Sequence, residues 1–168
     1  YWAISIARFV NGEPSEAFLD IPFLRQRIVA IRGQGAWRNQ KRLTPESRVA
    51  AASSCVSLCS RSIRVLQKRP DQSFPGKIRL LGVASLNLVS VAMGQTAGAL
   101  EATPKIWDLA AAWLVLTELG CPLIWLGPYP AHLEPGCDLS EMGFPVVAAG
   151  SQKHLERLAP WGELLLKG

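Results

Sequence analysis

Apolar and polar residues alternate along the first part of the chain with the two-residue period of half-buried β-strands. Asn11-Gly12 separates the first two alternating runs and is a strong hairpin signal, because both turn positions tolerate positive φ. Pro22 ends the second run, and the glycines within residues 33–35 indicate a further bend. The pattern predicts an antiparallel meander with strands over residues 2–10, 16–21 and 25–33.

Beyond residue 48, short apolar runs alternate with segments of helical periodicity. The predicted strands are residues 51–60, 77–83, 122–127 and 144–150. The predicted helices are residues 61–69, 85–100, 108–119 and 151–167. Between the last two strands, residues 128–143 are rich in Pro and Gly and predict a surface loop. Strands that alternate with helices are typical of an α/β sheet covered by helices.

We therefore expect an α/β fold, an α+β layered sandwich in two parts that meet near Arg48. Residues 1–48 are predicted to be a remnant antiparallel sheet of an N-terminal domain, and residues 49–168 a C-terminal α/β domain with a mixed or parallel sheet. No helix precedes the meander, so we expect a segment outside this sequence or another chain to cover it. The start at Tyr1, inside a strand pattern, indicates the C-terminal part of a longer protein.

Composition and charge limit the class of protein. The chain has 168 residues, of which 49% are hydrophobic and 18% charged, enough for a sizeable core. No apolar run approaches the roughly 20 residues that span a bilayer, so a membrane partner is not expected. The net charge of +5 comes from scattered Lys and Arg residues, which favour small anionic partners such as phosphorylated metabolites over nucleic acid.

The four cysteines predict neither a zinc site nor a disulfide framework. They lack C-x-x-C spacing, and the sequence has only two histidines. A core of this size needs no covalent staples, so we expect reduced, largely buried thiols and a cytoplasmic protein. The sequence also contains no G-x-S-x-G elbow and no phosphate-binding glycine loop. The cysteines are Cys55, Cys59, Cys121 and Cys137.

Two carboxylates near the helix pattern of residues 108–119 are the candidates for chemistry. Asp108 stands at the predicted helix start, where a carboxylate accepts hydrogen bonds from free N–H groups. A capping carboxylate keeps lone pairs for a cation, so capping and metal binding are compatible. Glu101 lies seven residues earlier and is either an exposed loop acid or an acid that points into the same crevice.

A glycine turn is predicted close to these acids. Gly82 stands where a strand pattern gives way to a helix pattern. Such a turn allows the backbone N–H groups of Val83, Ala84 and Ser85 to face a ligand at the N-terminus of a helix. The alternative is that Gly82 only makes the turn.

Four segments together resemble the inositol monophosphatase family. "IWDLAAAWLVLTELG" (residues 106–120) is similar to the family's second signature, W-D-x-A-[AG] followed by an apolar helix and E-x-G. "GVASLNLVSVAMGQTAGALE" (82–101) is similar to its G-[ST]-A-A helix and V-A-x-G segment. "ISIARFVNGEP" (4–14) and "AIRGQGAWRNQKRL" (30–43) resemble its strand with a hairpin and its G-x-G-A-x-x-N-G turn. The segments occur in the family's order through nearly the whole chain.

The resemblance implies a Mg²⁺-dependent phosphomonoesterase of small molecules such as inositol or sugar phosphates, assembled as a homodimer. It also admits sugar bisphosphatase and phosphoadenosine nucleotidase activities. In such enzymes several carboxylates hold Mg²⁺ ions that neutralise the phosphate and activate a water. The resemblance implies that Asp108 binds metal and that Glu101 holds a substrate hydroxyl. The turn at Gly82, Ala84 and Ser85 is implied to approach the substrate through its backbone.

The sequence departs from the family pattern at several positions. The first metal signature, D-P-[IL]-D-G-T, and the Glu upstream of it are absent, so we expect an incomplete metal site and a segment inactive by itself. Val83 replaces the usual Ser or Thr, Ala97 stands where many members carry Asp, and Gln40 replaces the turn glycine. The alternative function is a non-catalytic binding or assembly module that keeps the fold and has lost the metal site.

Overall fold

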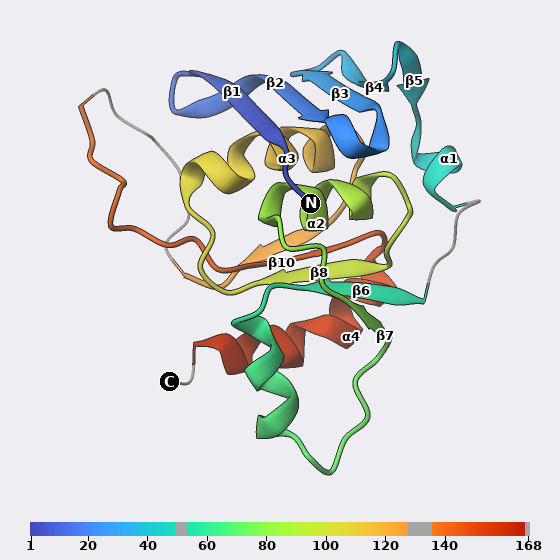
Figure 1. Ribbon diagram of the computed structural model, residues 1–168, viewed down its shortest axis with the longest axis vertical. Coiled ribbons are helices and arrows are strands. Elements are labelled where there is room, and N and C mark those ends of the chain that lie inside the picture. The colour runs from blue at the N-terminus through green and yellow to red at the C-terminus, as the bar shows by residue number, and fades with distance from the viewer. Residues whose placement is uncertain (50–53, 128–135, 167–168) are drawn as a thin grey trace.

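The computed structural model describes residues 1–49, 54–127 and 136–166. Within these residues two five-stranded sheets alternate with two helical layers (Figure 1). From top to bottom in Figure 1 the layers are sheet A, a pair of helices, sheet B, and the C-terminal helix with a short 3-10 helix beside it. The α+β layered sandwich predicted from the sequence is confirmed.

Sheet A is the predicted meander, extended by two further strands. Its neighbours are antiparallel throughout and follow chain order. The last hairpin turns at Asn39 and Gln40. Both residues have a positive φ, 48° and 68°, although neither is a glycine. The elements are β1 (Ile4–Val10), β2 (Glu13–Ile21), the 3-10 helix η1 (Pro22–Leu24), β3 (Gln26–Ile31), β4 (Gly35–Arg38) and β5 (Lys41–Leu43).

Sheet B is mixed and has the strand order β7-β6-β8-β10-β9. Its strands are β6 (Cys55–Leu58), β7 (Lys77–Arg79), β8 (Gly98–Glu101), β9 (Leu123–Trp125) and β10 (Val146–Ala149). Strand β6 pairs in parallel with β7 and with the central strand β8, whereas β10 is antiparallel to β8 and β9. The carboxyl ends of β7, β6 and β8 therefore meet at one edge of the sheet.

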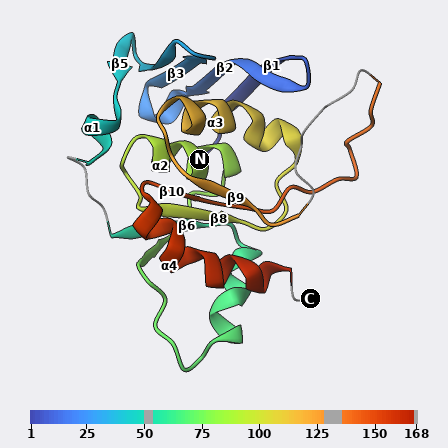
Figure 2. The same ribbon diagram turned by 180° about the vertical axis from the view of Figure 1, so that it is seen from behind.

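Helices α2 and α3 lie between the two sheets, and α4 covers the other face of sheet B (Figures 1 and 2). Residues 109–116 of α3 are all buried, because the helix contacts sheet A on one side and α2 on another. The helical elements are α1 (Pro45–Val49), η2 (Ser62–Lys68), α2 (Ala84–Ala92), α3 (Ile106–Glu118), α4 (Gln152–Gly162) and η3 (Glu163–Leu165).

The two faces of sheet A have different surroundings. On the inner face, Leu19, Ile28 and Ala36 are fully buried in one core with α2 and α3. The expectation that only a segment outside this sequence or another chain could cover the meander is therefore wrong for this face. The outer face carries a row of apolar side chains across β1, β2, β3 and β4. Each residue of this row is the register partner of the next one on the neighbouring strand. The row consists of Ile6, Phe18, Val29 and Trp37.

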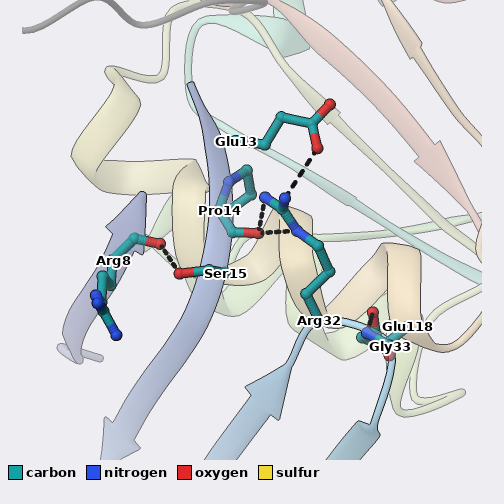
Figure 3. A network of polar contacts seen from close by, with 7 residues as sticks. All are labelled: Arg8, Glu13, Pro14, Ser15, Arg32, Gly33 and Glu118. Atoms are coloured by element: carbon teal, nitrogen blue, oxygen red, sulfur yellow. Dashed lines mark hydrogen bonds and ion pairs between the residues drawn. The ribbon is translucent and has the colours of Figure 1, made fainter. Parts of the chain in front are cut away.

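A carboxylate at the end of α3 attaches the helix to sheet A. The Glu118 side chain accepts hydrogen bonds of 2.8 Å from the backbone N–H groups of both Gly33 and Gly35. Next to this turn, Arg32 donates through Nε to the Pro14 carbonyl oxygen at 2.9 Å and pairs with Glu13 at 3.1 Å (Figure 3). The turn between β3 and β4 is thus fixed on the helix end and on β2.

The predicted helix over residues 85–100 is wrong in its second half. Helix α2 ends at Ala92, Gly94 adopts a φ of 72°, and the strand β8 begins at Gly98. All four residues of β8 are buried, so the strand has no alternation of apolar and polar positions. A side chain at Gly98 would collide with Leu158 of α4 and lie 3.0 Å from the Ala148 carbonyl oxygen.

The remaining elements match the sequence pattern with smaller changes. The predicted helix over residues 61–69 is the 3-10 helix η2, and the C-terminal helix divides into α4 and η3. Residues 51–53 of the predicted strand over 51–60, residues 128–135 of the predicted loop and residue 167 of the predicted C-terminal helix lie outside the described residues. In the described ranges no helix is both long and apolar enough to cross a membrane.

Candidate functional site

A cavity of about 450 Å³ lies at the edge of sheet B where the parallel strands end. Its walls come from the segments that follow β6, β7 and β8 and from the first turns of α2 and α3. Ligands of α/β sheets commonly bind at this edge. The lining residues are Leu58, Cys59, Ser60, Arg61, Leu80, Gly82, Val83, Ala84, Asn87, Glu101, Thr103, Pro104 and Asp108.

The structure brings four of the five predicted site residues together. Asp108, Glu101, Gly82 and Ala84 all line this cavity, although they come from three different segments of the chain. Ser85 is buried and is not among the residues that line it. The functions assigned to these residues remain predictions, but the shared location required for a common site is present.

Asp108 is held by the helix that it helps to start. Helix α3 begins at Ile106 with Lys105 as the N-cap residue, so Asp108 is the third helical residue and not the first, as the sequence pattern predicted. Its Oδ2 accepts a 2.9 Å hydrogen bond from the Lys105 backbone N–H, which is the half of a capping box in which the N3 side chain reaches back to the N-cap residue. Capping therefore occupies one carboxylate oxygen and leaves Oδ1 for the cavity.

Glu101 is the last residue of β8, and its exposed fraction is only 2%. The interpretation of Glu101 as an exposed loop acid is therefore wrong. Asn87 of α2 donates a 2.6 Å hydrogen bond from Nδ2 to Glu101 Oε1. The pKa of the Glu101 carboxyl is raised from its usual 4.5 to about 7, mainly by burial and to a smaller extent by the charge of Asp108. Hydrogen bonds from Asn87 and Cys59 oppose this rise in pKa.

The turn that precedes α2 is open toward the cavity. Gly82 has a φ of 79°, and a side chain there would meet no atom within 4 Å. Val83 follows as an extended N-cap residue, and among the described residues no side chain caps this helix start. The first backbone N–H groups of α2 are therefore placed beside the cavity, as expected for a turn that approaches a ligand through its backbone.

Sequence reasoning missed several residues of the cavity. Asn87 gives a local signal, because it is a single amide in the apolar run of α2. The sequence around Cys59, Arg61 and Thr103 gives no such local signal. Arg61 Nη1 donates a 2.8 Å hydrogen bond to Thr103 Oγ1 across 42 residues of sequence, and only the pairing of β6 with β8 brings the two segments together.

The donor set of the cavity fits part of a Mg²⁺ site. The carboxylate oxygen of Asp108 is the kind of ligand that Mg²⁺ prefers. Mg²⁺ requires about six oxygen ligands, however. The described part of the chain contains no group of three or more His, Cys, Asp and Glu side chains that could hold a metal ion. Asp108 therefore fits as one ligand, and the other oxygens must come from substrate, water or other residues.

A larger hollow of about 720 Å³ lies over the outer face of sheet A. Its floor includes Val29, Ile31 and Trp37, and its one acid, Asp20, is paired with Arg27 at 3.5 Å. This hollow has an apolar floor, and the charge of its carboxylate is balanced by an ion pair. The cavity with Asp108 and Glu101 offers the more reactive chemistry, so we place the candidate site there.

Solved structures of phosphatases share this fold. An IMPase/NADP phosphatase crystallised with NADP and Ca²⁺ superposes with a TM-score of 0.72 at 26% identity, over 94% of this chain and 59% of that chain. Inositol monophosphatase II of Staphylococcus aureus gives a TM-score of 0.75 at 20% identity, over 99% of this chain and 64% of that chain. The chain therefore has the fold of the inositol monophosphatase class.

Sequence relatives extend this likeness. An inositol-1-monophosphatase of Rhizobium meliloti is 30% identical over 127 residues, covering 71% of this chain and 48% of that protein. A fructose-1,6-bisphosphatase/inositol-1-monophosphatase of Thermotoga maritima is 29% identical over 125 residues, covering 71% of this chain and 47% of that protein. A Nus factor SuhB of Xylella fastidiosa is 30% identical over 139 residues, covering 71% and 46%.

The model of the inositol monophosphatase family matches residues 1–159. The chain belongs to this family, as the resemblance of its segments predicted. It spans about half the length of the relatives named above.

Proposed function

We propose that the complete protein is a Mg²⁺-dependent phosphomonoesterase that acts on inositol phosphate or a related small sugar phosphate. The observation that carries the proposal is the meeting of Asp108 and Glu101 with the Gly82 turn in one cavity of a chain from a phosphatase family. The 168 residues contribute one part of the metal site, so we propose that they are inactive by themselves. A homodimer, a cytoplasmic location and a domain boundary near Arg48 remain predictions.

In this proposal the residues of the cavity have different roles. Bound Mg²⁺ supplies charge neutralisation at the phosphate and an activated water. Asp108 contributes its Oδ1 as a ligand, while its Oδ2 stays fixed to the Lys105 N–H. The Glu101 carboxyl, held by Asn87, binds a substrate hydroxyl. The backbone of the turn at Gly82, Ala84 and Ser85 positions the substrate, and of these residues Gly82 and Ala84 line the cavity.

Replacement of Asp108 by Asn in the complete protein tests the proposal. The amide oxygen still accepts the hydrogen bond that caps α3 but provides no anionic ligand, so Mg²⁺-dependent phosphate release falls by more than about a hundredfold. Thermal melting checks that the fold is kept. Glu141→Gln is the control, because this exposed acid does not line the cavity and its variant keeps the original rate. Unchanged phosphate release from Asp108→Asn would exclude Asp108 as a metal ligand.

A second candidate is a non-catalytic binding or assembly module that keeps the fold. Its support is the donor set, since the described residues hold no group of three metal-binding side chains. Calorimetric titration of the 168-residue chain with Mg²⁺ separates the two candidates. Binding at micromolar strength by this chain would count against the module.

A further inference from the structure

Two apolar residues line the cavity on either side of the Gly82 turn. Leu80 is the first residue after β7, and Val83 is the N-cap residue of α2. Leu80 is 53% exposed and belongs to neither cluster of apolar side chains among the described residues. Packing inside the protein therefore does not account for an apolar side chain at this position. Val83 packs in part against the core that contains α2 and α3, and it also lines the cavity.

The strand order of sheet B separates these apolar residues from the acids of the cavity. Strand β6 lies between β7 and β8, and it is parallel to both. Leu80 directly follows β7, whereas Glu101 is the last residue of β8. Two strand spacings of about 4.8 Å place the ends of β7 and β8 roughly 10 Å apart. The cavity of about 450 Å³ is of a size that holds a small metabolite at this edge.

The two sides of the cavity favour different chemical groups. The Glu101 carboxyl on the β8 side can form a hydrogen bond with a hydroxyl. The side chains of Leu80 and Val83 have no hydrogen-bond donor or acceptor, so the turn that carries them offers only its backbone groups. A hydroxyl placed against these side chains loses its hydrogen bonds with water and gains no replacement. A ring face made of C–H groups is stabilised there, because its apolar surface leaves water.

We propose that Leu80 and Val83 are specificity-determining residues that select phosphate esters of partly deoxygenated ring alcohols. This inference rests on the proposed phosphatase function and narrows its substrate class. The preferred alcohol keeps a hydroxyl for Glu101 and places a face without hydroxyls against Leu80 and Val83. A ring with a hydroxyl on every carbon, such as inositol, binds with lower affinity, because it must bring hydroxyls against the apolar side.

Two esters of six-membered rings that differ in their hydroxyls test this role in the complete protein. Inositol 1-phosphate is compared with trans-2-hydroxycyclohexyl phosphate, which keeps one hydroxyl beside the ester. Mg²⁺-dependent phosphate release gives kcat and KM for each ester. The KM of the cyclohexyl ester is expected to be lower by about tenfold, because its C–H face is buried against the apolar side without loss of hydrogen bonds.

Leu80→Asn and Val83→Thr place a polar group on the apolar side with little change of side-chain shape. Each variant lowers the preference by about threefold or more, through the ratio of the two KM values, because a hydroxyl now finds a partner there. Thr is a good N-cap residue, so Val83→Thr keeps the start of α2 intact. Leu166→Asn is the matched control, since Leu166 is 55% exposed but does not line the cavity, and its variant retains the full preference.

The outcomes separate this inference from the function on which it rests. A KM for inositol 1-phosphate equal to or below that of the cyclohexyl ester would overturn the inference and leave the phosphatase function in place. A preference that is unchanged in both Leu80→Asn and Val83→Thr would do the same. Absence of Mg²⁺-dependent phosphate release from both esters would overturn the proposed function, and the inference with it.

Discussion

Replacement of Glu101 by Gln changes how the stability of the protein depends on pH. Glu101 is 2% exposed, and burial raises the pKa of its carboxyl from 4.5 to about 7. The folded protein therefore binds this proton more tightly than the unfolded chain does. As pH rises from about 4.5 to about 7, the proton must be given up in a buried environment, and the free energy of unfolding falls.

The magnitude follows from the change in pKa. A difference between 4.5 and about 7 corresponds to roughly 3 kcal/mol of stability that is present below about pH 4.5 and lost above about pH 7. Glutamine is neutral at every pH, and its amide oxygen can still accept the hydrogen bond from Asn87. Glu101→Gln therefore gains stability relative to the original protein, by up to about 3 kcal/mol, as pH rises through this interval.

Urea unfolding of both proteins between pH 4 and pH 8, with a chelator present, measures this difference. The exposed Glu141 provides a control, and the Glu141→Gln variant follows the pH dependence of the original protein. A difference between Glu101→Gln and the original protein that stays constant over the whole interval would refute the reasoning. In that case the Glu101 carboxyl would titrate alike in the folded and unfolded chains.

Two further variants test the packing that supports the site. Glu118→Ala removes the acceptor of the Gly33 and Gly35 N–H groups, and urea unfolding should show a loss of about 2 kcal/mol; a loss below about 0.5 kcal/mol would show that water replaces the carboxylate. Gly98→Ala forces a methyl group against Leu158 and should cost about 1–3 kcal/mol in the same assay. Thermal melting that matches the original protein would show that α4 moves aside freely.

The sequence predicts sheet A well because each strand has one apolar face. Strand β2 shows this clearly, with Ala17, Leu19 and Ile21 buried and the residues between them less buried. Helix α3 is predicted for the complementary reason, since its apolar run is long and ends at Gly120. These elements are encoded locally, so a sequence pattern is sufficient to find them.

The missed strand β8 shows why the site is harder to predict. Its four residues are covered on both faces, so no alternation marks it as a strand. Without β8, Glu101 lies on a connection between two helices, where an acid is usually exposed. The burial of Glu101 depends on α2, which places Asn87 against its carboxyl. The spacing along the chain predicts that Glu101 lies near Asp108. The protonation of Glu101, however, is determined by tertiary packing.

The orientation of α3 determines where the Asp108 carboxylate lies in the cavity. The helix has 13 residues and is therefore a rod about 20 Å long. Glu118 anchors one end to the turn of sheet A, and Asp108 lies in the first turn at the other end. A tilt of about 3° about the anchored end moves the Asp108 carboxylate by about 1 Å, an error that can slow a reaction about a hundredfold. If Asp108 binds metal as proposed, changes at Gly33 and Gly35 are therefore expected to alter catalysis, although this turn lies at the opposite end of α3 from Asp108.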